Sequence, residues 1–123
     1  MKSDNKKTGT IGEDIAIDFL KKKGYKIIER NYRCVFGEID IVACDRSDIV
    51  FVEVKSRRSE YFGDPTDAVD LHKQKKISKI ALNYLNEKQC DDRDARFDVI
   101  AIKLSPNGNT VELIENAFEV AWE

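Results

Sequence analysis

The stretch GEIDIVACDRSDIVFVEVKSR, from Gly37 to Arg57, contains two apolar runs separated by a polar turn. Short runs rich in Val and Ile on either side of a turn predict two antiparallel strands joined as a hairpin. Asp40, Glu53 and Lys55 interrupt these runs instead of flanking them. Because burying an unpaired charge is costly, these three residues are the first candidates for a functional site.

The position of the turn sets the register of this predicted hairpin. A turn centred between residues 46 and 47 places Asp40 opposite Glu53, and Glu38 opposite Lys55. Directly opposed side chains have Cβ atoms about 4.5–5.5 Å apart, and two carboxylates at that distance repel by about 3 kcal/mol at an effective dielectric of about 20. Protonating one acid relieves the repulsion, and so does a divalent cation; oxygen ligands favour Mg²⁺ or Mn²⁺.

Lys55 lies two residues beyond Glu53, so both side chains face the same side of the strand. Two acids with an adjacent amine are suited to phosphodiester hydrolysis. A bound metal polarises a phosphoryl oxygen and acidifies a water, while Lys55 stabilises the charge that develops on the phosphate. The alternative is an ordinary polar sheet face with Glu38 and Lys55 as a cross-strand pair, which leaves Asp40 opposite Glu53 unexplained.

Two helices are expected on either side of the hairpin. Apolar residues recur at helical spacing from about Ile11 to Lys23, Thr10 to Glu13 fits a capping box, and Gly24 suits a left-handed stop. A second apolar stripe predicts a helix that is capped by Asp64, has Pro65 at its first position, and ends near Glu87.

Further strands complete an α/β fold with a mixed central sheet flanked by helices. Residues 25–33 predict a strand before the hairpin. In the first strand of the hairpin, Ile39, Ile41 and Ala43 are expected to face one way. Arg96 to Leu104 follow a helix and are therefore expected to pair in parallel with an earlier strand, and residues 111–118 predict an edge strand.

Composition limits the class of protein. A chain of 123 residues predicts one domain, here over residues 10–123 after a flexible segment, 1–9. No apolar run approaches the ~20 residues needed to cross a membrane, and three cysteines with neither a CxxC pair nor an export signal suggest reduced thiols in the cytoplasm. A net charge of −2 argues against a generic nucleic-acid coating protein.

The segments GEDIAIDFLKKKGYKIIERNYR, GEID, VFVEVKSR, FGDP, KISKIALNYL and RFDVIAI together resemble the YraN-like family of bacterial proteins, whose members are predicted endonucleases. Asp40 followed by Glu53-Val54-Lys55 resembles the D…ExK signature of the restriction-endonuclease-like, or PD-(D/E)xK, superfamily, and the expected fold is similar to that of archaeal Holliday junction resolvases. In this signature Ile39 stands before Asp40 where some members have Pro.

The resemblance implies roles for individual residues. Asp40 and Glu53 would bind Mg²⁺ or Mn²⁺ together with the Val54 carbonyl oxygen, and Lys55 would be catalytic. Glu13 matches a position where related nucleases place another acid, although the capping box offers it a different role. Glu38 would lie at the rim of the site. Candidate phosphate contacts are Arg57, Arg58, Lys75, Lys76 and Lys79.

Three functions are therefore considered. The first is a metal-dependent nuclease that acts on DNA, with branched DNA as a candidate substrate and a homodimer or protein partner adding affinity. The second is a non-catalytic module that retains the nuclease fold and binds nucleic acid or protein. The third is a metal-dependent hydrolase of a small phosphate ester.

Overall fold

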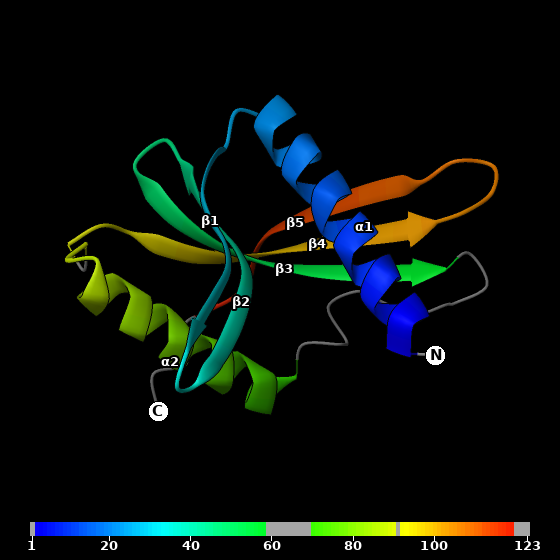
Figure 1. The fold of residues 1–123 in the computed structure, drawn as a ribbon. Helices are drawn as coiled ribbons and strands as arrows, with labels where there is room; N and C mark the ends of the chain where they lie inside the picture. Colours follow the sequence, from blue (N-terminus) through cyan, green and yellow to red (C-terminus); the bar gives the residue numbers. More distant parts are fainter. Residues whose placement is uncertain (1, 59–69, 91, 120–123) are drawn as a thin grey trace.

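The computed structural model describes residues 2–58, 70–90 and 92–119, with side chains from residue 9 onward. The described chain forms two helices and five strands (Figure 1), which are, in order, α1 (Lys2–Lys22), β1 (Lys26–Cys34), β2 (Gly37–Asp45), β3 (Asp48–Arg58), α2 (Leu71–Glu87), β4 (Ala95–Leu104) and β5 (Thr110–Phe118).

The strands form one mixed sheet in the order β1-β2-β3-β4-β5. β3 and β4 are parallel, and the other neighbouring pairs are antiparallel. This arrangement confirms the predicted mixed α/β fold, including the parallel strand after the second helix and the strand at the edge. The two helices cover opposite faces of the sheet, which gives three layers with a core on each side.

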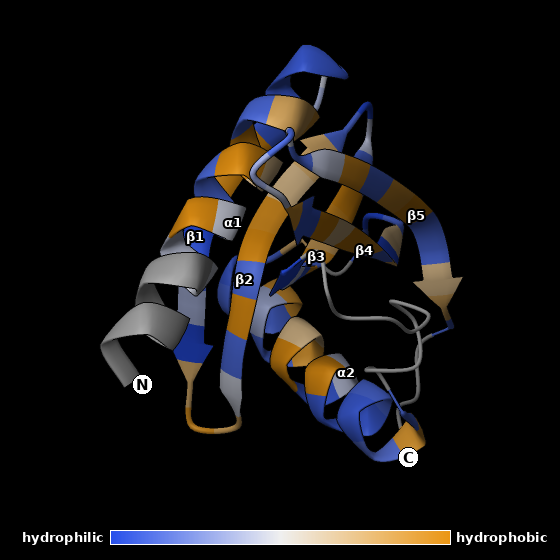
Figure 2. Cartoon of the chain, turned by 90° about the vertical axis from the view of Figure 1, so that its right-hand side faces the viewer, coloured by the Kyte–Doolittle hydropathy of each residue, from blue (hydrophilic) through white to orange (hydrophobic). Residues whose placement is uncertain are grey.

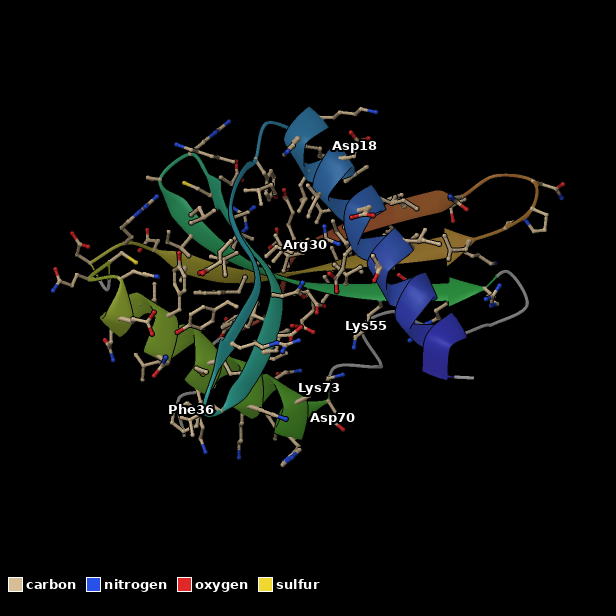
Figure 3. The ribbon with its side chains drawn as sticks, viewed as in Figure 1. Asp18, Arg30, Phe36, Lys55, Asp70 and Lys73 are labelled. Carbon is tan, nitrogen blue, oxygen red and sulfur yellow. The ribbon has the colours of Figure 1, made fainter. Side chains whose placement is uncertain are left out.

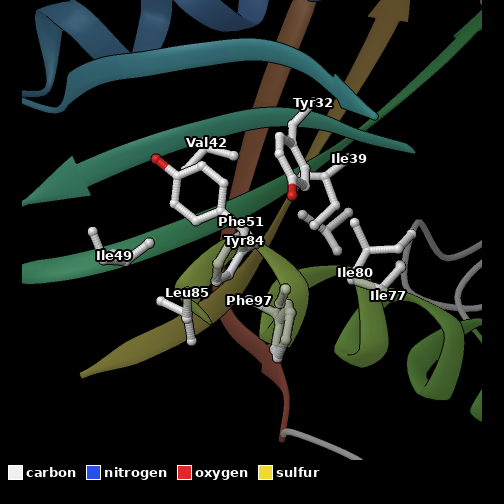
Figure 4. Close-up of a cluster of buried hydrophobic side chains, with 12 residues drawn as sticks. Tyr32, Ile39, Val42, Ile49, Phe51, Ile77, Ile80, Tyr84, Leu85 and Phe97 are labelled. Atoms are coloured by element: carbon white, nitrogen blue, oxygen red, sulfur yellow. The ribbon is translucent and has the colours of Figure 1, made fainter. Parts of the chain in front are cut away.

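The core beneath α2 is built around aromatic rings (Figure 4). The ring of Tyr84 meets those of Tyr32 and Phe51 edge-on, with centroids 5.0 and 5.7 Å apart. Ile77 and Ile80 of the same helix are also buried in this cluster. Because these side chains recur at i, i+3, i+4 and i+7, one apolar stripe fixes α2 against the sheet.

The core beneath α1 is aliphatic and depends on a close approach of helix and sheet. Ala16 and Leu20 are fully buried against β2, β3 and β4. Figure 2 shows hydrophobic and hydrophilic residues alternating along α1. A Cβ atom at Gly12 would lie 1.7 Å from the Ser56 Oγ atom of β3. Glycine at this position therefore lets α1 cross β3 next to Lys55.

The helix boundaries differ from those predicted. α1 begins at Lys2 instead of Ile11, so Thr10 is inside the helix and the predicted capping box is wrong. The flexibility predicted for residues 1–9 concerns motion and stays a prediction. The stop at Gly24 is confirmed, because its φ of +96° is left-handed.

α2 begins at Leu71, and its N-cap is Asp70, whose side chain accepts a hydrogen bond from the Lys73 backbone N–H. The caps predicted at Asp64 and Pro65 lie outside the described residues. Neither α1 nor α2, the helices in the described part of the chain, has the length and apolar character needed to cross a membrane. The three cysteines are free thiols, as predicted.

The predicted hairpin register is confirmed, but the side chains of β2 do not alternate regularly. Ile41 pairs with Val52 and Asp45 with Asp48, as a turn between residues 46 and 47 requires. Ile39, however, packs in the cluster beneath α2, while Ile41 and Ala43 face α1. The prediction that these three residues share a face is therefore wrong, and the change of face lies where the β2–β3 ladder ends, between Ile39 and Ile41.

Candidate functional site

The candidate site lies where β2 separates from β3. Their ladder ends at the Ile41–Val52 pair, whereas β3 continues beside β4 as far as Arg58. Past the end of the ladder, the Val54 backbone N–H donates to the Asp40 Oδ2 atom at 2.8 Å. A side-chain carboxylate thus replaces the backbone acceptor that β2 no longer supplies. Asp40 and Glu53 are neighbours across this opening, although no ladder pair joins them.

Glu53 is the most perturbed acid of the site. It is 9% exposed, and its Oε1 atom is buried without a hydrogen-bond partner. Burial, followed by the Asp40 charge, raises the pKa of Glu53 from 4.5 to about 8. Burial also raises the pKa of Asp40, although the Val54 hydrogen bond opposes that shift. The predicted proximity of the two acids is therefore confirmed, and it is electrostatically unfavourable in the absence of a cation.

Two amines face these acids. Lys55 is half-buried on β3, and burial followed by the nearby Lys73 side chain lowers its pKa below 10.5. The charges of Glu53 and Asp40 oppose that shift. Figure 3 shows Lys55 on the side of β3 that faces the first turn of α2, where Lys73 lies. The lysine predicted to accompany the acids is thus present, and a second one lies beside it.

Sequence reasoning missed Lys73. The helix start predicted at Asp64 and Pro65 would place Lys73 well inside a helix, with no reason to single it out from its lysine neighbours. With Asp70 as the cap, Lys73 is the residue whose backbone N–H the cap accepts, at 2.9 Å. The Asp70-x-x-Lys73 spacing was the available signal, since a cap residue bonds two or three residues into its helix.

Glu13 lies near Asp40 but already has a partner. The Asp40 pKa is raised in part by the Glu13 charge, which places this acid at the edge of the site. Its Oε1 atom also accepts a hydrogen bond from Arg30 Nε at 3.3 Å, and Arg30 forms a second ion pair with Asp14. Glu13 is therefore not used by a capping box, and its predicted role as a metal ligand stays a prediction.

Glu38 does not pair with Lys55, so that part of the prediction is wrong. Glu38 lies opposite Arg33 on β1 and forms a 2.5 Å ion pair with it. The β2–β3 ladder ends before it reaches Glu38, which leaves β1 as the nearer source of a counter-charge. Glu38 still contributes to the field at Asp40, whose pKa it raises.

The predicted phosphate contacts lie on two elements. Arg57 and Arg58 follow Lys55 at the end of β3, where Arg57 is half-buried and Arg58 is exposed. Three lysines, Lys75, Lys76 and Lys79, are exposed on α2. Lys76 lies against Gly37, where an added Cβ would meet its Cε atom at 3.0 Å. None of these placements tests their predicted role in binding nucleic acid.

The donor set suits a hard divalent cation. Asp40 and Glu53 supply carboxylate oxygens, and the unpartnered Glu53 Oε1 atom is a buried acceptor of the kind that an ion would satisfy. Within residues 2–58, 70–90 and 92–119, no three His, Cys, Asp or Glu side chains are grouped closely enough to hold a metal. Asp40 and Glu53 therefore provide two carboxylates, and further ligands would be the Val54 carbonyl oxygen, water, substrate or Glu13, whose predicted role stays open.

A second charged cluster lies on the face of the sheet covered by α1. Asp98 is fully buried and accepts hydrogen bonds from Arg96, the Tyr25 hydroxyl and the Asn116 backbone N–H. Arg96 also forms an ion pair with Asp45 at 2.9 Å. These contacts join β2, β4 and β5 to the end of α1, which indicates a structural role.

The fold and site define a three-layer α/β protein in which a buried acid, a half-buried acid and two amines meet where two strands separate. Residues 12–102 match the model of "Uncharacterised protein family UPF0102", and the chain belongs to this family. The YraN-like resemblance is thereby confirmed at the level of the family.

The chain is similar over almost its full length to several UPF0102 proteins. One from Syntrophus aciditrophicus (strain SB) is 55% identical over 118 residues, which cover 96% of this chain and 93% of the relative. One from Caldanaerobacter subterraneus subsp. tengcongensis is 50% identical over 122 residues, which cover 96% and 100%. A solved structure described as "Crystal structure of SSO0001" covers 90% of this chain and 51% of its own, at 16% identity and a TM-score of 0.34. The structural likeness is too distant to carry an argument.

Proposed function

We propose that this protein is a metal-dependent nuclease of the restriction-endonuclease-like class that hydrolyses phosphodiester bonds in DNA. The observation that carries the proposal is the close pair of the half-buried Asp40 and the buried Glu53, with the Lys55 amine beside them. Buried like charges destabilise a fold, and strong perturbation of this kind is typical of functional sites. The D…ExK resemblance supports the same reading.

Each residue has a defined task in this proposal. Asp40 and Glu53 hold Mg²⁺ or Mn²⁺, which when bound polarises a phosphoryl oxygen and lowers the pKa of a coordinated water. The hydrogen bond from Val54 fixes the Asp40 carboxylate in place. Lys55 donates to the phosphate oxygens, on which negative charge increases in the transition state. Arg30 holds Glu13 at the edge of the site.

A cleavage assay tests this proposal. Wild type and Asp40→Asn are incubated with linear, nicked, flapped and four-way DNA in Mn²⁺ or Mg²⁺, and products are separated on denaturing gels. Asp18→Asn is a matched control, because Asp18 pairs with Lys22 on the surface of α1 with 66% of its side chain exposed. We expect metal-dependent cutting by wild type and Asp18→Asn that is lost in Asp40→Asn. Cutting retained by Asp40→Asn contradicts the proposed site.

The second candidate is a non-catalytic module that keeps the nuclease fold and binds nucleic acid or protein. The observation in its favour is that, among the described residues, no three His, Cys, Asp or Glu side chains are grouped to hold a metal, while Glu13 is held by Arg30. Saturable DNA binding by wild type, with no cleavage of any substrate in either metal, would establish this function instead. Hydrolysis of bis(p-nitrophenyl) phosphate without DNA cleavage would indicate a hydrolase of small phosphate esters.

A further inference from the structure

Lys73 occupies an unusual position for a lysine of this chain. It is half-buried in the first turn of α2, and its backbone is held by the Asp70 cap. Its side chain lies near those of Lys55 and Glu53, since it lowers the pKa of both. Within the described ranges, Lys73 belongs to no ion pair, whereas Arg30, Arg33 and Arg96 each form at least one.

The balance of charge around Lys73 indicates what it can bind. With a divalent cation bound, Asp40 and Glu53 would both be ionised, and their two negative charges would offset the two ammonium groups of Lys55 and Lys73. A divalent cation held by the carboxylates would leave the opening with two positive charges in excess. In a half-buried place such an excess is costly unless an anion neutralises it. A phosphate group with several acceptor oxygens provides that neutralisation and accepts hydrogen bonds from both amines.

We propose that Lys73 binds a phosphate group of the nucleic-acid substrate, so that α2 supplies a second cation beside Lys55. This inference rests on the proposed nuclease function and extends it from the hairpin to the helix. The buried Glu53 Oε1 atom has no hydrogen-bond partner, which is an observation independent of the α2 N-terminus in favour of a ligand at this place. Lys73 is thereby a substrate-positioning residue, and a purely structural lysine would not affect binding through its charge.

The test measures binding separately from cleavage. A fluorescein-labelled four-way junction and a linear duplex are titrated with protein in Ca²⁺, fluorescence anisotropy is recorded, and gels of the same samples verify that the probes remain intact. The variants are Lys73→Gln and Lys73→Arg. Lys21→Gln is the matched control, because Lys21 is exposed in the last turn of α1 and its loss changes net charge equally. Circular dichroism melts verify that each variant is folded.

We expect Lys73→Gln to weaken binding roughly tenfold, as loss of one charge-assisted hydrogen bond implies. The slope of log affinity against log salt should fall by about 1, because one phosphate contact is lost. Lys73→Arg should bind within a few-fold of wild type, and Lys21→Gln should match it. In Mn²⁺, Lys73→Gln should raise the KM for cleavage more than it lowers kcat, because the lost contact holds the substrate before reaction.

The outcomes separate this inference from the function on which it rests. Wild type that neither binds nor cuts DNA overturns the proposed nuclease and the role of Lys73 together. Wild type that binds DNA while Lys73→Gln binds equally well, with the same salt slope, overturns the Lys73 inference alone. Equal losses in Lys73→Gln and Lys73→Arg would show that side-chain shape matters and not charge, which also overturns it.

Discussion

Replacing Glu53 by Gln should stabilise the metal-free protein, and the gain should grow with pH. The buried carboxyl has a folded pKa of about 8 against 4.5, so the native state holds its proton more tightly than the unfolded chain. For an acid whose pKa is raised on folding, stability is complete below pH 4.5 and is lost as pH rises towards the folded value. Gln keeps the shape of the side chain and carries no charge to desolvate.

The size of this effect follows from the pKa shift. Each pH unit between the two pKa values removes about 1.4 kcal/mol of wild-type stability. The free energy of unfolding of the wild type should therefore be lower than that of Glu53→Gln by about 3 kcal/mol at pH 7 and by about 5 kcal/mol at pH 9. At pH 4 the two should differ little. For a domain of this size, 3 kcal/mol corresponds to roughly 10 °C in melting temperature.

The assay is urea unfolding in EDTA at pH values from 4 to 9, followed by circular dichroism. Glu112→Gln is the matched control, because Glu112 is an exposed glutamate on β5, where surface substitutions change stability by less than about 0.5 kcal/mol. Parallel pH profiles for wild type and Glu53→Gln would refute the reasoning, since they would mean that Glu53 is solvated in the folded protein. A free energy of unfolding that falls more steeply with pH in Glu53→Gln than in the wild type would also refute the reasoning.

Further predictions concern the cation, the helix crossing and the second cluster. Saturating Mn²⁺ should raise the wild-type melting temperature by roughly 10 °C at a hundred times the dissociation constant, and Asp40→Asn should abolish the rise; a rise retained by Asp40→Asn would place the metal elsewhere. Gly12→Ala should cost about 1–3 kcal/mol in urea unfolding through its clash with Ser56, and Ser56→Gly should restore much of the loss. Gly9→Ala, with nothing within 4 Å of the added Cβ, should instead stabilise α1 by about 0.5–1 kcal/mol; equal effects at both glycines would contradict the close crossing. Asp98→Ala should cost about 3–5 kcal/mol in the same assay, because it removes the fully buried carboxylate that accepts from Arg96, Tyr25 and the Asn116 N–H, and a loss below 1 kcal/mol would show that water replaces the carboxylate.

The features that could be predicted from the sequence are those that a local pattern encodes. Alternating apolar residues and a short polar turn fixed the hairpin register, because shifting a strand by one residue would expose its buried face. Asp40, Glu53 and Lys55 stood out because each breaks an apolar run. The left-handed stop at Gly24 was predictable for the same local reason, since glycine adopts positive φ at little cost.

The features that could not be predicted arise between elements. Glu38 pairs with Arg33 because the β2–β3 ladder ends before Glu38 would lie opposite Lys55. No local pattern in the hairpin sequence predicts where that ladder ends. Ile39 packs beneath α2 although Ile41 faces α1, an irregularity that a simple alternation of faces does not predict. Lys73 lies in the first turn of α2 because Asp70 caps that helix, and Lys75 and Lys76 close by in the sequence give no reason to prefer it.

The charged residues of the candidate site reduce the stability of the fold. The two acids lie beside each other and the two amines do likewise, which places like charges together in a half-buried region. Such local conflicts are expected where function requires them. The residues of β3 before Glu53 are buried in the cores on both faces of the sheet, which fixes the position of this acid in the fold. Binding of a cation and an anionic substrate would then recover the free energy that folding gives up at Glu53.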